Sequence, residues 1–140
     1  MVHVREFRRA CYEAARRTGG SVSEFRFCAG MVTPNFDQGV ITYRDRTIGV
    51  FCARESGVPL LAVAKPRVIT GPDVSESGPL TFVEAHEVIG VLAEFPGFRV
   101  LTPAELDGPV DLSAWPHLFP YDLRYWRPET LGEALFNYWD

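Results

Sequence analysis

Residues 84–90, which read EAHEVIG, hold the arrangement nearest to a catalytic motif in this 140-residue chain. A zinc-protease motif needs two histidines four residues apart on one helical face, with a glutamate after the first. Here His86 and Glu87 supply the first two members, but Gly90 occupies the position of the second histidine. The segment therefore lacks a metal-binding pair, and we expect neither a metal nor a cofactor.

Three cysteines offer another kind of chemistry, but their number and spacing argue against it. They stand far apart among apolar neighbours: Cys11, Cys28 and Cys52. No C-x-x-C pair is present, so the sequence supports neither a zinc knuckle nor a thioredoxin-type redox pair. A cysteine nucleophile would also need a histidine base that only the fold can place. Reduced, buried thiols are typical of the cytoplasm, where we therefore expect this protein.

Motifs of other enzyme classes are missing as well. The chain holds no G-x-S-x-G, no P-loop and no dinucleotide-binding fingerprint. Its 18 aspartates and glutamates include no pair that stands out in sequence as acid and base. The sequence therefore predicts no catalytic residue and favours a protein without enzymatic activity.

The first expected helix, residues 4–18, carries a flank of arginines. Its apolar residues recur at spacings of three and four, which gives one apolar stripe. Beside this stripe, with Tyr12 among them, lie the candidate anion-binding residues Arg5, Arg8, Arg9 and Arg16. They could bind a phosphate or an acidic partner. They could equally form the solvated side of an amphipathic helix, with stems that cover apolar surface.

Charge is unevenly distributed along the chain. Residues 1–69 carry eleven basic and six acidic side chains, a net charge of +5, whereas residues 70–140 carry three basic and twelve acidic ones, −9. The total of −4 does not favour nucleic acid or an anionic membrane as a partner. The apolar runs are also far shorter than the ~20 residues of a membrane-spanning helix, so we expect no membrane segment.

The C-terminal part is rich in aromatic residues. Residues 115–140 hold eight of the eighteen aromatic side chains, including all three tryptophans. Tyrosine and tryptophan are enriched at binding hot spots because they give a large contact area with few rotors. On this interpretation the partner-binding residues are Tyr125, Trp126, Arg127, Tyr138 and Trp139. The alternative is that these side chains anchor an irregular segment to the core.

The end of the chain resembles that of a known group of proteins. Residues 126–128 read WRP, residues 130–133 read TLGE, and residues 135–140 read LFNYWD. This pattern is similar to the C-terminal segment of a family of small, uncharacterised bacterial proteins. Residues 98–107, FRVLTPAELD, share the likeness more loosely. The resemblance implies a bacterial, cytoplasmic protein and no particular activity.

The elements that must position these residues follow from hydrophobic spacing and turn residues. A stretch of β character begins with Val22, Phe25 and Phe27, and strands are expected at residues 40–43, 47–53 and 58–64. Short connections force antiparallel neighbours, and residues 34–39 are expected to form a turn. The apolar run at 60–64 predicts a central strand covered on both faces. Residues 68–70 could add an edge strand before a loop at 71–79 that is rich in Gly, Pro and Ser.

Three T-x-x-E sequences indicate helix starts in the second half. In such a capping box the threonine and the glutamate each satisfy a backbone amide at the start of the helix. The boxes are Thr81 with Glu84, Thr102 with Glu105, and Thr130 with Glu133. They predict helices at 81–95, 102–106 and 131–139, and a short strand at 98–101. Four prolines between the last two boxes predict irregular chain there.

Together these signals predict one α+β domain over residues 1–140. It has an N-terminal helix, an antiparallel meander of four to five strands, a helix packed on the sheet, and an irregular C-terminal segment that ends in a short helix. The favoured function is a small non-enzymatic protein-binding module, of immunity or regulatory-adaptor type, that uses its acidic, aromatic C-terminal surface. A homodimer through that surface stays open.

The alternative is a small enzyme or small-molecule-binding protein. Its pocket would lie between the sheet and the helix at 81–95, under a lid at 71–79. The candidate polar residues for this pocket are Arg44, Arg46, His86 and Glu87.

Overall fold

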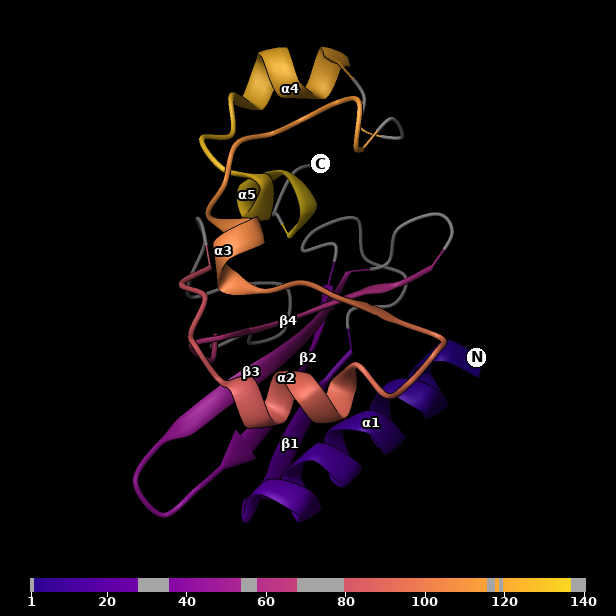
Figure 1. The fold of residues 1–140 in the computed structure, drawn as a ribbon, viewed down its shortest axis with the longest axis vertical. Helices are drawn as coiled ribbons and strands as arrows, with labels where there is room; N and C mark the ends of the chain where they lie inside the picture. Colours follow the sequence, from indigo (N-terminus) through magenta and orange to yellow (C-terminus); the bar gives the residue numbers. More distant parts are fainter. Residues whose placement is uncertain are drawn as a thin grey trace.

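A five-stranded sheet lies at the centre of the protein, in a computed structural model that describes residues 2–27, 36–53, 58–67, 80–115, 118 and 120–136 (Figure 1). The elements are α1 (Val2–Thr18), β1 (Ser21–Arg26), β2 (Phe36–Thr42), β3 (Thr47–Ala53), β4 (Leu60–Ala64), α2 (His86–Leu92), β5 (Arg99–Val100), α3 (Pro103–Leu106), α4 (Pro120–Trp126) and α5 (Leu131–Leu135). The predicted α+β class and N-terminal helix are confirmed.

The strands lie in the order β1-β2-β3-β4-β5. The first four form the predicted antiparallel meander, but β5 pairs with β4 in parallel. A parallel neighbour needs a crossover connection, and the segment that contains α2 supplies it. The sheet is therefore mixed, and its last strand depends on a helix that covers one of its faces.

Two hydrophobic clusters fill the two faces of the sheet. Because side chains alternate along a strand, Val50 and Cys52 of β3 pack in the cluster with α1 and α2, whereas Phe51 and Ala53 pack in the cluster with α3 and α5. Every residue of β4 is buried, which confirms the central, doubly covered strand. The protein thus has three layers, and α4 lies at one end of its long axis (Figure 1).

The helix α2 is shorter than the sequence predicts, and the first capping box is wrong. Its N-cap is Ala85, and no side chain caps it. Thr81 instead accepts a 2.9 Å hydrogen bond from Lys65 through its carbonyl, and the Val83 N–H donates to the Val63 carbonyl at 3.1 Å. Residues 81–83 are thus held in extended conformation along β4. The predicted boxes at α3 and α5 are both confirmed.

Other boundaries differ because tertiary pairing overrides local turn signals. β2 begins at Phe36, inside the predicted turn, because it pairs with β3 along its whole length. α4 is a helix where irregular chain was expected. The last helix, predicted at 131–139, is shorter: α5 ends at Leu135, and its C-cap Phe136 has an extended backbone conformation. The strand predicted at 68–70 and the loop at 71–79 lie outside the described residues.

No helix in the described ranges is both long enough and apolar enough to span a membrane.

Candidate functional site

The helix α4 exposes a group of aromatic side chains. None of its seven residues is buried. Tyr121 and Tyr125 are 68% and 67% exposed, and Trp126 is 37% exposed. Leu123 of this helix packs against the hydrophobic cluster below it. Because exposed apolar groups of this kind mark interaction sites, α4 is the candidate binding surface.

The rings of α4 form one contiguous group. Tyr121 and Tyr125 lie four residues apart and therefore share one face of the helix. Their ring centroids are 6.4 Å apart, and the rings are nearly parallel, with an interplanar angle of 12°. Tyr125 also meets Trp126 edge to face, with centroids 5.0 Å apart. The ring contacts hold the side chains in one arrangement, which lowers the entropy that binding would cost.

Arg127 ends α4 in an unusual backbone conformation. Its φ is +48°, and its N–H donates a 2.9 Å hydrogen bond to the carbonyl of Leu123. Glycine is the common residue at such a position, because the left-handed conformation costs other residues about 1–2 kcal/mol. The following residue, Pro128, restricts Arg127 further. A cationic residue thus occupies, directly after Trp126, a position whose backbone conformation glycine would adopt at lower cost.

The structure brings together three of the five predicted partner-binding residues. Tyr125, Trp126 and Arg127 are consecutive at the end of α4, whereas Tyr138 and Trp139 lie outside the described residues. Sequence reasoning left Tyr121 out of this set. Its four-residue spacing from Tyr125 was the available signal, which the expected irregular chain concealed.

The aromatic residues of the C-terminal part divide into buried and exposed side chains, and the partner-binding interpretation of the exposed ones stays a prediction. Trp115 and Phe136 are buried, at 6% and 1% exposure, and both belong to the cluster between the sheet and the C-terminal helices. They anchor the segment, as one interpretation predicts. The exposed rings on α4 fit the other.

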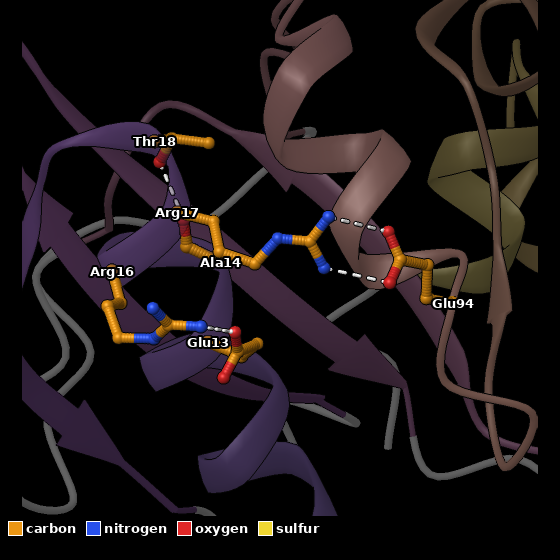
Figure 2. A network of polar contacts seen from close by, with 6 residues as sticks. All are labelled: Glu13, Ala14, Arg16, Arg17, Thr18 and Glu94. Atoms are coloured by element: carbon orange, nitrogen blue, oxygen red, sulfur yellow. Dashed lines mark hydrogen bonds and ion pairs between the residues drawn. The ribbon is translucent and has the colours of Figure 1, made fainter.

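The predicted arginine flank lies on α1, where most of its members contact the protein itself. The guanidinium of Arg8 lies over Phe25, at 5.3 Å from the ring centroid. Arg9 lies 3.9 Å from Glu6, and Arg16 pairs with Glu13 (Figure 2). Arg5 is exposed. These contacts belong to a solvated helix face, and an anion-binding role stays a prediction.

An ion pair joins the end of α1 to the end of the α2 segment. Arg17 donates two hydrogen bonds, of 2.8 and 2.9 Å, to the two carboxylate oxygens of Glu94 (Figure 2). These hydrogen bonds lower the pKa of Glu94. Next to Arg17, the hydroxyls of Thr18 and Tyr43 share a hydrogen bond of 2.5 Å. The ion pair thus links the two helices, and the shared hydroxyl hydrogen bond links the end of α1 to the residue that follows β2.

A groove of about 480 Å³ runs between the same two helices. It is lined by Arg17, Thr18, His86, Glu87, Gly90, Val91 and Glu94. Two of the four polar residues predicted for a ligand pocket, His86 and Glu87, therefore line a groove at the α1–α2 surface. The other two, Arg44 and Arg46, lie in the β2–β3 turn, where Arg46 is over the ring of Tyr43.

The two described cysteines pack in the hydrophobic core. Cys11 and Cys52 are buried and reduced, in the cluster under α1 and α2. Burial raises the pKa of Cys11, with a further increase from the nearby Cys52, so Cys11 is protonated at neutral pH. A buried thiol makes a poor nucleophile. Within the described ranges no three His, Cys, Asp or Glu side chains are grouped to hold a metal ion.

Comparison with known proteins adds no relative. A scan against models of protein families finds no match, and searches of curated proteins and of solved structures find none either. The interpretation of the site therefore depends on its own geometry.

Proposed function

We propose that this protein is a small, non-enzymatic protein-binding module of the cytoplasm, of immunity or regulatory-adaptor type, which binds its partner through α4. The observation that carries the proposal is the group of exposed rings at Tyr121, Tyr125 and Trp126, on a helix that buries none of its residues. Rings of this kind are enriched in interface hot spots. The backbone conformation of Arg127 supports the same surface, since such strain is concentrated at functional positions.

Charge and sequence resemblance fit the same proposal. Residues 70–140 have a net charge of −9, which favours a basic partner for this half of the chain. The resemblance of the C-terminal segment to small bacterial proteins fits a bacterial, cytoplasmic protein and implies no particular activity. A second copy of the chain is the competing occupant of α4.

Site-specific photo-cross-linking tests the proposal. A benzophenone amino acid replaces Tyr125 in one variant and Tyr12 in the control; Tyr12 is 51% exposed on α1. We expect the Tyr125 position to yield an adduct with a separate protein that the Tyr12 position does not give. The partner, once identified and purified, should bind the unmodified protein and lose affinity for a variant with Tyr121→Ser and Tyr125→Ser.

Two results would count against this function. One is an adduct that forms equally from both positions. The other is a purified partner that binds the double serine variant as tightly as the unmodified protein. An adduct between two copies of this chain, with concentration-dependent sedimentation, would instead establish the homodimer.

The groove between α1 and α2 favours a second candidate, a protein that binds a small polar ligand. His86 and Glu87 line it beside the ion pair of Arg17 and Glu94. If this candidate is correct, His86→Ala abolishes ligand binding and leaves cross-linking from α4 unchanged.

A further inference from the structure

The C-terminal lobe, defined as residues 101–115, 118 and 120–136, carries negative charge that the described residues do not neutralise. Its carboxylates are all exposed or half-buried: Glu105, Asp107, Asp111, Asp122, Glu129 and Glu133. Within the described ranges none of these six pairs with a cation, whereas Glu6, Glu13 and Glu94, outside the lobe, each pair with an arginine. Two basic residues, Arg124 and Arg127, leave the lobe a net charge of −4.

Several aromatic rings in the protein have an arginine guanidinium group lying over them. The four described pairs are Arg8 over Phe25 at 5.3 Å, Arg9 over Phe95 at 5.9 Å, Arg46 over Tyr43 at 5.2 Å and Arg99 over Trp115 at 4.3 Å, measured to the ring centroid. Those four rings are buried or half-buried, whereas Tyr121 and Tyr125 are exposed. Among the described residues, no guanidinium group lies over the ring of Tyr121 or Tyr125.

From these two observations, and resting on the proposed function, we propose that the partner docks an arginine-bearing segment on α4. Its guanidinium groups lie over the rings of Tyr121 and Tyr125, and its remaining positive charge faces the carboxylates of the C-terminal lobe. Arginine suits this site better than lysine, because the guanidinium is planar and weakly hydrated and stacks on aromatic faces.

A second copy of the chain is a weaker candidate for this occupant. Four of the five arginines on its α1 already contact the chain itself: Arg9 and Arg16 pair with glutamates of their own helix, and Arg17 pairs with Glu94. Arg8 is already over Phe25. A separate protein whose arginines are uncommitted binds without breaking these contacts.

Two synthetic peptides of equal length and charge provide the test with the full-length protein. In one, arginine alternates with serine; in the other, lysine replaces every arginine. We expect the arginine peptide to bind more tightly, by roughly 2- to 5-fold for each ring that it covers. In protein with ¹³C-labelled tyrosine rings, the signals of Tyr121 and Tyr125 should shift, and that of Tyr12 should not.

Variants separate the stacking contribution from the charge contribution. Tyr121→Leu with Tyr125→Leu keeps an apolar surface and should abolish the preference for arginine, while the salt-dependent binding of both peptides remains. The double substitution Asp107→Asn with Asp111→Asn should lower the affinity for both peptides by the same factor. All four positions are exposed, and thermal unfolding checks that each variant is folded.

Equal affinity for the two peptides would overturn the inference, as would an arginine preference that survives in the double leucine variant. So would sedimentation that gives self-association through Tyr121 and Tyr125. The proposed function fails separately: a cross-linked partner without arginine at the contact leaves that function standing and removes only the inference. If no specific partner is cross-linked, both fall.

Discussion

Gly132 lies at the point where α5 meets Phe82 and α3, and it offers the sharpest test of the packing. A Cβ atom at this position would lie 2.3 Å from Cε2 of Phe82 and 3.1 Å from the carbonyl oxygen of Leu106. Carbon atoms in contact normally lie about 3.5–4.0 Å apart. The Phe82 ring also contacts Phe136, with centroids 6.1 Å apart, so it cannot retreat without disturbing the core. Gly132→Ala therefore forces a movement of about 1 Å.

The expected cost follows from two opposing effects. Overpacking a well-packed site costs about 1–3 kcal/mol, and an overlap this large lies near the upper end. Alanine regains up to ~1 kcal/mol of helix propensity relative to glycine. We expect Gly132→Ala to lower the free energy of unfolding by about 1.5 kcal/mol and the Tm by roughly 3–6 °C.

Gly90→Ala is the matched control. Gly90 lies in α2 and is exposed, and a Cβ there meets nothing within 4 Å. The same substitution should therefore raise the free energy of unfolding by roughly 0.5–1 kcal/mol. Urea unfolding, followed by circular dichroism and by tryptophan fluorescence, measures both variants and checks that the transition is cooperative.

A double-mutant cycle assigns the cost to the ring. A leucine side chain at position 82 lacks the Cε2 and Cζ atoms that the new Cβ would meet, so Gly132→Ala should lose more than half of its cost in a Phe82→Leu background. The packing argument is refuted if alanine stabilises the protein equally at positions 90 and 132, or if the cost at position 132 is unchanged in the Phe82→Leu background.

Three further predictions concern a helix cap, an ion pair and a thiol. Thr130→Ala removes a capping box and should lower the free energy of unfolding by about 1 kcal/mol, whereas Thr81→Ala, at a box that does not form, should cost little; urea unfolding of both decides this. Because Arg17 lowers the pKa of Glu94, their pair stabilises the protein above about pH 4.3, and this contribution is lost as the pH falls through the lowered pKa of Glu94. Arg17→Met should therefore show a smaller loss of stability on acidification, and an identical pH profile for the two proteins would contradict this. Cys11, whose pKa burial raises, should resist iodoacetamide at pH 8 until urea unfolds the protein, as peptide mass spectrometry would report; rapid labelling of the native protein would disprove its burial.

Local sequence signals predict the fold well where the structure they specify is itself local. The boxes at Thr102 and Thr130 form as expected, because all of their hydrogen bonds lie within one helical turn. The identical pattern at Thr81 does not form a cap because residues 81–83 instead pair with the edge of β4, through Lys65 and Val63. The four residues of a capping-box pattern carry no information about pairing with a segment elsewhere in the chain, so this pairing could not be predicted from them.

Only part of the candidate site could be predicted from the sequence, for a related reason. Composition marks the C-terminal part as aromatic, but it does not separate Trp115, which is buried, from Tyr125, which is exposed, since burial depends on how the segment packs in three dimensions. The prolines around α4 indicated irregular chain. Pro120 in fact begins the helix, at a position where proline loses no helical hydrogen bond.

Both edges of the sheet are blunted, and this restricts how the protein can associate. The edge strand β1 carries an irregularity between Val22 and Glu24, and its other residues include the charged Arg26. On the far side, β5 and residues 81–83 each cover half of β4. Bulges, charges and short covering segments discourage pairing between backbones of different molecules. We therefore expect that any association of this protein uses its side chains rather than strand addition at either described edge.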